Sequence, residues 1–487
     1  MFDPNTKEGA VFMAAVNAYR RMGRFRTQRE RMKNYAYGRQ WNDPVSDPLT
    51  EETMSEGELS RRTTGRQPMT NNMIRQMVKT IIGRFRGMRA QENRDDNDPM
   101  ALLYNQNCLD ELDSRAFEEF LMSGCVVQRV ALECRRDGVV RKYVDNVSPA
   151  DFFVNDVTDP RGCDIELAGM VHDMSLADVE MRFGGNDMNR IRKIRRIYGF
   201  ENDIEAMGRQ AADPGLLTGG DTPRFFRSPT GRCRVIEVWT LESSRVVRIV
   251  DPETGRYREM TLTTAVETEL AEEMARRHKK GQAPLKTGHT RRHRWHGRFY
   301  APDGSLLSHC LSQLGSGEHP FAVKFYPLID GEVHSFVEDI VDQQRQINRL
   351  LNLADHIMST AAKGVLMFPT RAKPDFVSWR EIARRWAVCG SIIPYEPVGN
   401  GDLPRQVTSS GLDAGVTGLL DTQMKLIRDI SGVGTVISGG NSVSGAGADS
   451  LSVQVDNATM ALNDLFATFT DFISRRDAKA ADLPDKI

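Results

Sequence analysis

Apolar residues recur at every third or fourth position in several stretches of the chain, which is the spacing of one helix face. The predicted helices cover residues 8–37, 71–88, 99–123, 176–183, 264–280, 335–363, 416–431 and 449–476. Shorter runs of strand-forming residues predict strands at residues 126–134, 139–144, 165–171, 235–241 and 246–250. We therefore expect an α+β fold, with helices and short strands mixed through residues 1–263.

The helix predicted at residues 335–363 has the longest apolar stripe. Ile340, Ile347, Leu350 and Leu351 belong to this stripe, and the polar residue Gln344 interrupts it. At ~1.5 Å per residue the helix would be roughly 40 Å long, which is long for a globular protein. We expect its four apolar residues to form a packing face.

A second helix is predicted at residues 264–280. Thr264 and Glu267 have the spacing of a capping box, and Gly281 follows as a stop signal. Between the two helices, the turn at residues 302–305 predicts a hairpin in a small β-rich insert. Two long helices that carry an insert at their tip predict an extended structure rather than a compact core.

The insert is strongly basic. Residues 274–302 contain nine arginines and lysines and no acidic residue. A solvated loop usually mixes charges of both signs. The predicted docking residues are Arg291, Arg292, Arg294, Trp295 and Arg298. An acidic protein partner is the favoured ligand, DNA phosphates are the second, and a surface that serves only solubility is the third.

Length, net charge and cysteine content limit the class of protein to which the chain can belong. The 487 residues are enough for two or three domains, and the net charge of −1 gives no overall basic field for nucleic acid. Seven scattered cysteines without a C-x-x-C pair predict buried, reduced thiols in a cytoplasmic setting. The first residues do not resemble a signal peptide, and no apolar run approaches the ~20 residues that span a bilayer. We expect a soluble protein without a membrane segment.

The sequence predicts no catalytic residue, no metal and no cofactor. It contains no Walker A loop, no dinucleotide-binding fingerprint and no hydrolase or zinc-protease motif. His289, His293 and His296 would be the best metal candidates if they shared a helical face. However, basic residues surround them, and no thiolate or carboxylate lies nearby in the sequence.

Several short patterns occur in an order that resembles one known family. The patterns are Tyr37–Trp41, Asn71-Asn72, Ser148–Phe153 with Asp156 and Asp164, Asp303-Gly304, His319–Phe321, Tyr326-Pro327, and Asp342 with Gln346–Asn348. Their order over most of the chain resembles the portal proteins of tailed bacteriophages, which are podovirus-like head-to-tail connectors.

The resemblance implies a division of the chain into the parts of a portal subunit. Residues 1–263 would form an α+β wing, and residues 264–281 a first stem helix. Residues 282–334 would form the clip, 335–363 a second stem helix, and 364–413 a return to the wing. Residues 414–487 would form two helices that flank a tunnel loop, with a short crown.

The expected tunnel loop lies in the uncharged, Gly- and Ser-rich residues 432–448. Its residues Gly432, Gly434, Ser438, Asn441 and Ser444 would face translocating DNA. An uncharged loop suits a sliding contact, because DNA that binds tightly cannot move. The alternative is a flexible surface loop.

The resemblance also implies a function. About twelve subunits would form a ring at one capsid vertex of the virion, assembled in the host cytoplasm. Double-stranded DNA would pass through the channel, and terminase, a tail or adaptor protein, and the major capsid and scaffolding proteins would be the partners. Two alternatives remain: a nucleic-acid-processing enzyme with a basic DNA-binding insert, and a scaffold unrelated to phage.

Overall fold

The computed structural model describes residues 6–48, 50–90, 99–134, 138–199, 223–228, 230–252, 254–262, 264–361, 365–387, 392–396, 403–407, 414–433 and 460–484. The chain forms two compact units. Unit 1 consists of Met1–Glu30, Ile82–Ser335 and Asn463–Ile487, and unit 2 of Arg31–Ile81 and Phe336–Leu462. Helices α2 (Gly23–Ala36) and α4 (Met73–Ala90) contribute residues to both units. Within the described residues, no helix is both long and apolar enough to cross a membrane.

Unit 1 is built on two antiparallel sheets. The larger has six strands in the order β10-β9-β7-β6-β5, with β8 paired to the second half of β7. Its strands are β5 (Phe152–Val154), β6 (Leu167–Met174), β7 (Cys233–Val250), β8 (Tyr257–Thr261), β9 (Lys286–Tyr300) and β10 (Leu306–Leu311). The smaller sheet has the order β11-β3-β4 and consists of β3 (Cys125–Cys134), β4 (Val140–Asn146) and β11 (Phe321–Phe325). Strands β12 (Leu328–Ile329) and β13 (Glu332–Val333) form a short hairpin.

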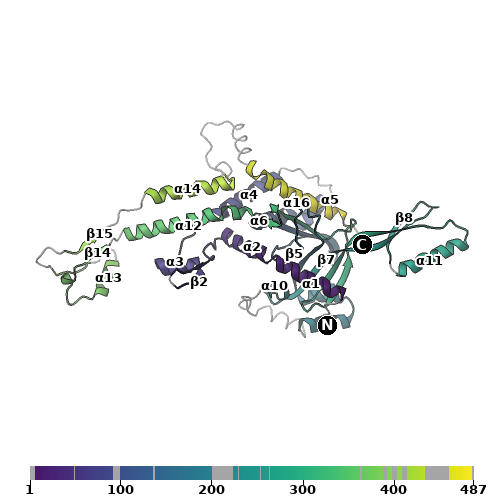
Figure 1. The fold of residues 1–487 in the computed structure, drawn as a ribbon, viewed down its shortest axis with the longest axis horizontal. Coiled ribbons are helices and arrows are strands. Elements are labelled where there is room, and N and C mark those ends of the chain that lie inside the picture. Colours follow the sequence, from purple (N-terminus) through teal and green to yellow (C-terminus); the bar gives the residue numbers. More distant parts are fainter. Residues whose placement is uncertain are drawn as a thin grey trace, which may run out of the picture. The chain divides into compact units, whose positions relative to one another are not determined.

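Apolar residues on both faces of the larger sheet are covered. Helix α1 (Lys7–Arg21) lies beside the sheet (Figure 1). Its Tyr19 packs against Phe153 on one face. On the other face, Phe152 packs with Phe321 of the smaller sheet. Because successive residues of a strand point to opposite faces, the pair Phe152-Phe153 shows that β5 is buried on both sides.

The remaining helices of unit 1 surround these sheets. They are α5 (Pro99–Asn107), α6 (Leu109–Ser123), α7 (Leu176–Val179), a π-helical turn (Glu180–Gly184), α8 (Met188–Tyr198), α10 (Pro223–Phe226), α11 (Thr264–Lys279) and α16 (Asn463–Asp482). Aromatic rings join α16 to α6, with Phe469 contacting Phe117 and Phe120. Gly124 ends α6 in the left-handed region at φ 67°, as a helix stop requires.

Unit 2 is mostly helical. Its elements are β1 (Pro44–Ser46), β2 (Thr53–Ser55), α3 (Glu56–Thr64), α12 (Phe336–Ala361), β14 (Val365–Met367), a 3-10 turn (Thr370–Ala372), α13 (Trp379–Ala387), β15 (Arg405–Val407), α14 (Ala414–Ser431) and a second 3-10 turn (Met460–Leu462). β1 pairs with β2 and β14 with β15, both antiparallel. α12 and α14 pack side by side (Figure 1).

The predicted mixture of helices and strands is confirmed, but several boundaries differ. The helix predicted at 8–37 is two helices, and the one at 99–123 is divided at Cys108, which has a φ of 50°. The prediction of two separate strands at 235–241 and 246–250 is wrong. β7 is a single strand because β9 pairs with it continuously from Ile236 to Val250.

The same pairing corrects the predicted separation of residues 282–334 from the wing. β9 and β10 belong to the larger sheet, and β11 pairs with β3. The sequence indicates strands locally, but it does not show that their partners lie far away in the chain. The hairpin turn at residues 302–305 is confirmed between β9 and β10.

Candidate functional site

Unit 2 contains a helix pair with an insert between its members. The first helix is α12, the insert is residues 362–413, and the second helix is α14, which lies beside α12 (Figure 1). We call residues 336–431 the helix–insert–helix segment. The helix predicted at 335–363 corresponds to the first member of this pair.

Many large apolar side chains of this segment are exposed in the single chain. They are Leu353 and Met358 in α12, Met367, Phe376, Trp379, Ile392, Tyr395 and Leu403 in the insert, and Leu419, Leu426 and Ile430 in α14. Phe376 and Ile392 are 80% and 84% exposed. Soluble monomers rarely gather so many exposed apolar residues, so this segment has the character of a surface that other protein covers.

The four predicted packing residues of α12 divide into two pairs. Ile340 and Ile347 are fully buried, whereas Leu350 and Leu351 are half-buried. Two of the predicted packing residues are therefore buried within the subunit, and the other two are partly accessible.

Residues from three of the portal-like patterns meet in a polar network of unit 2. The side chain of Asn348 donates to Gln40 Oε1 at 2.6 Å and accepts the backbone N–H of Asn71 at 3.0 Å. Gln40 in turn donates to Asn72 Oδ1 at 3.1 Å. Gln40 and Asn348 are both 2% exposed. Buried amides need such partners, so these residues fix the position of α12 within its unit.

Gln344, which interrupts the apolar stripe, has a structural role in the same network. Its Oε1 accepts the N–H groups of Met73 at 3.0 Å and Ile74 at 3.3 Å. Those amides open α4 and have no partner inside the helix. Sequence reasoning missed this role, although a polar residue in an apolar stripe was the available signal.

The basic stretch lies on a projecting part of the larger sheet. The arm, as we call residues 242–294, contains the second half of β7, β8, α11 and the first half of β9. Arg291 and Arg292 are exposed and Arg294 is half-buried. Arg292 Nε lies 2.6 Å from Glu259 Oε1 in β8. Although residues 274–302 contain no acidic residue, strand pairing brings Glu259 of β8 within reach of Arg292.

Trp295 and Arg298 lie in the sheet and are not available to a partner. Trp295 is 7% exposed and packs edge-on against His319. Arg298 is 3% exposed and binds Glu242 Oε1 at 2.7 Å. Although burial alone would raise it, the pKa of Glu242 is lowered to about 2 by hydrogen bonds from Lys7 and Arg298. The docking role predicted for Trp295 and Arg298 is therefore corrected.

The three histidines of this stretch lie on β9 and not on a helix. In a strand, residues four apart are separated by roughly 13 Å, which is too far to share one ion. Among the residues that the structure describes, no group of three or more His, Cys, Asp or Glu is placed to hold a metal ion.

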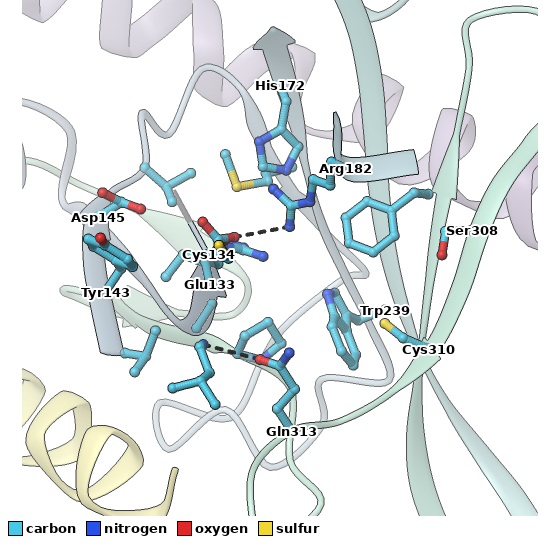
Figure 2. A pocket seen from close by; sticks show the side chains of 18 of the residues that line it. Glu133, Cys134, Tyr143, Asp145, His172, Arg182, Trp239, Ser308, Cys310 and Gln313 are labelled. Carbon is cyan, nitrogen blue, oxygen red and sulfur yellow. Dashed lines mark hydrogen bonds and ion pairs between the residues drawn. The ribbon is translucent and has the colours of Figure 1, made fainter. Parts of the chain in front are cut away.

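A cavity of about 1040 Å³ opens in unit 1 between the two sheets (Figure 2). Its charged residues bind one another, since Arg182 lies 3.0 Å from Glu133 at the cavity wall. Deeper, Arg129 lies 3.0 Å from the buried Glu237. Although burial opposes ionisation, Arg129 and His172 hold the pKa of Glu237 well below its usual range. Burial raises the pKa of the Cys310 thiol to about 11, which makes it a poor nucleophile.

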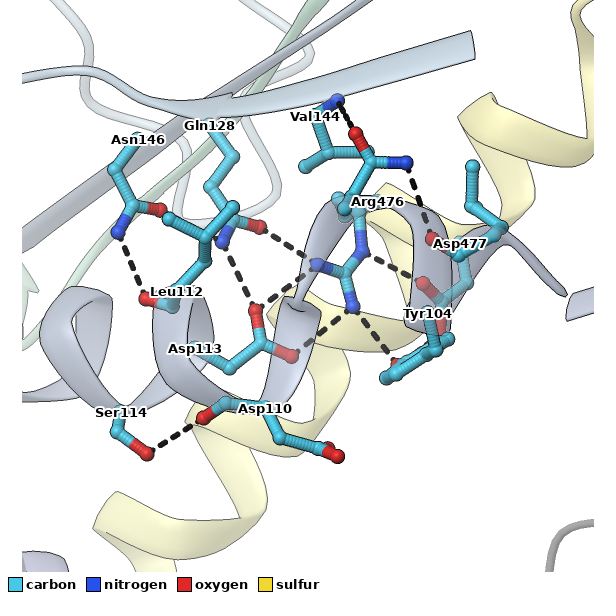
Figure 3. A network of polar contacts seen from close by, with 12 residues as sticks. Tyr104, Asp110, Leu112, Asp113, Ser114, Gln128, Val144, Asn146, Arg476 and Asp477 are labelled. Carbon is cyan, nitrogen blue, oxygen red and sulfur yellow. Dashed lines mark hydrogen bonds and ion pairs between the residues drawn. The ribbon is translucent and has the colours of Figure 1, made fainter. Parts of the chain in front are cut away.

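A second buried ion pair joins α16 to α6 (Figure 3). Arg476 Nη1 lies 2.9 Å from Asp113 Oδ1, and both side chains are almost fully buried. Arg476 also donates to Gln128 Oε1 at 3.2 Å and to the Tyr104 hydroxyl at 2.8 Å. We interpret this network as a structural junction between α16 and α6, because its hydrogen bonds are made within the protein.

The predicted tunnel loop falls almost entirely outside the described residues. Gly432 follows the end of α14 with a φ of 65°. Gly434, Ser438, Asn441 and Ser444 lie outside the part of the chain that the structure describes.

Comparison with known proteins agrees with the resemblance. A search of curated proteins finds no match to this chain. A scan against protein-family models matches residues 14–476 to the phage P22-like portal protein family. The match covers nearly all of the residues that form both units. The chain therefore belongs to the phage P22-like portal protein family.

Proposed function

We propose that this protein assembles through its helix–insert–helix segment into a closed ring of about twelve subunits. As a member of the portal family, the chain is a structural protein of the capsid vertex that serves DNA packaging and connects head to tail. The family implies a homo-oligomeric ring and contact with DNA. The number of subunits and the surfaces that form the ring belong to the proposal.

One observation carries the proposal: the exposed apolar side chains of α12, α14 and the insert. Leu419 and Leu426 are 54% and 40% exposed on α14, and Leu353 is 46% exposed on α12. Burial of apolar area stabilises association by roughly 25 cal/mol per Å². In a closed ring every subunit meets two neighbours through different faces, so both sides of such a segment become covered.

The proposal assigns roles to the other parts of the chain as well. The insert at the end of the helix pair would be the clip, and it replaces residues 282–334 in that role. Residues 432–448, with Gly432, Gly434, Ser438, Asn441 and Ser444, would form the tunnel loop toward DNA. Terminase, a tail or adaptor protein, and the capsid and scaffolding proteins would be the partners, with assembly in the host cytoplasm. Arg292 and Arg294 stay a predicted docking surface for terminase or adaptor.

The alternative of a nucleic-acid-processing enzyme is not supported, because the matching family is structural.

The test is electron microscopy and native mass spectrometry of the purified full-length protein. We expect rings with an axial hole, and a mass that corresponds to about twelve chains. Leu353→Ser with Leu419→Ser should leave the subunit folded but shift the population from rings to monomers. Met188→Ser is the matched control, since Met188 is 60% exposed on α8 in unit 1. Monomers from the wild-type chain, or full rings from the double variant, would contradict the proposal.

A further inference from the structure

The pleat of the arm separates its arginines into two sets. β7 and β9 pair without a register shift from Ile236 opposite Tyr300 to Val250 opposite Lys286. Side chains therefore alternate strictly between the two faces of the arm. Arg292 and Arg294 lie on one face, and Arg291 lies on the other, directly opposite Arg245.

The two faces differ in how their charges are balanced. On the face of Arg292, the Glu259 carboxylate lies 2.6 Å from Arg292 Nε and 4.0 Å from Arg248 Nε. On the opposite face, Arg245 and Arg291 are exposed cross-strand neighbours. Within the described residues, neither guanidinium has an ion pair or a side-chain hydrogen bond. Like charges directly opposite each other destabilise a sheet, so this pair has a cost that the subunit alone does not offset.

Helix α11 of the same arm carries acidic side chains before its basic last turn. Glu269 and Glu272 are exposed, and residues three apart are neighbours on a helix surface. Neither carboxylate forms an ion pair with another described residue. The helix is held to the arm near its other end, where Arg277 donates to both oxygens of Asp251 at 3.0 and 2.8 Å. The acidic pair is therefore presented on an anchored helix.

We propose that the Arg245–Arg291 face of one subunit contacts Glu269 and Glu272 on α11 of a second copy of the chain. The inference rests on the proposed ring. A head-to-tail ring brings two different surfaces of the same chain together at each interface. The basic set and the acidic set of the arm can therefore pair between neighbouring subunits. DNA is the less favoured occupant, because its phosphates could pair with the arginines but would leave Glu269 and Glu272 without a partner.

Charge reversal and rescue test this contact. The variants are Arg245→Glu with Arg291→Glu, Glu269→Lys with Glu272→Lys, and the combination of all four. The matched control is Arg190→Glu with Arg192→Glu, which makes the same change of charge on exposed arginines of α8. Circular dichroism and thermal unfolding verify that each subunit is folded. Mass photometry then gives the concentration of half-assembly at about 0.15 M salt, where exposed charges interact over about 8 Å.

Wild-type rings test the proposed function and come first. Given those rings, each double reversal should raise the concentration of half-assembly by roughly tenfold or more, and the fourfold variant should restore it. The control should assemble like the wild type. Double-reversal variants that assemble normally, or a fourfold variant that stays defective, would refute the proposed contact. Neither result would contradict the ring itself. Variants that form normal rings but lose only DNA binding, or only terminase binding, would show that the arginines bind that ligand. This result would also refute the proposed contact between subunits.

Discussion

Replacing Arg476 with methionine tests the junction between α16 and α6 most directly. Methionine keeps the unbranched stem but leaves the Asp113 carboxylate, which is 2% exposed, without its guanidinium. Removing one partner of a buried ion pair costs about 3–5 kcal/mol, because the other charge stays buried. For a unit of this size that loss lowers the melting temperature by roughly 10 °C.

The assay is thermal unfolding of the purified protein, with a double-mutant cycle. Arg475→Met is the matched control, since the side chain of the neighbouring Arg475 is 39% exposed, pairs with Asp471 at 3.1 Å and donates to the backbone carbonyl of Arg161 at 3.1 Å. An exposed pair of this kind contributes roughly 0–1 kcal/mol. Asp113→Leu with Arg476→Met should recover much of the loss, because the buried carboxylate is removed together with its guanidinium, and Asp477, which also loses this partner, is partly exposed. A small loss from Arg476→Met, or losses that simply add in the double variant, would refute the reasoning.

Three further outcomes can be checked by unfolding experiments. Gln344→Leu should destabilise unit 2 by about 1–3 kcal/mol, because the Ile74 amide loses its acceptor and the Met73 amide loses one of two acceptors. The exposed Gln346→Leu should be nearly neutral, and equal effects would count against the network. Glu242→Gln should be less stable than the wild type at neutral pH. The pKa of Glu242 is lowered to about 2 from 4.5, so this difference should persist above pH 4.5 and fade as pH falls toward 2; a gap that does not depend on pH would show that ionisation is irrelevant. Trp295→Ala should cost about 3–5 kcal/mol as a core truncation, whereas Arg291→Ser should cost roughly 0–1 kcal/mol; similar losses would mean that β9 is not divided into buried and exposed positions.

Local signals in the sequence predicted local structure well. The stripe of α12, the stop at Gly281 and the turn at residues 302–305 each depend on residues close together in the chain, and all three agree with the structure. The order of short patterns also indicated the correct family, because it draws on the whole chain.

Long-range pairing could not be predicted in the same way. Nothing near Trp295 shows that β9 pairs with β7, so a buried tryptophan resembled an exposed aromatic in a basic loop. Likewise, the charge of Arg292 is balanced by Glu259, which lies on another strand. The burial of Trp295 and Arg298 and the ion pair of Arg292 could not be predicted for the same reason: the partners of a strand in a sheet are not its neighbours in the sequence.

The contact between Arg476 and Asp113 also has a consequence for the order of folding. The two residues are 363 positions apart, and α16 packs on α6 through Phe469 and Phe117. Contacts of such high sequence separation form late, since a long loop must close first. During synthesis α6 is therefore made long before α16 can cover it, and its aromatic face stays exposed while unit 2 emerges. Chains interrupted before residue 463 should aggregate through that face, and chaperones that bind aromatic surfaces should retain them.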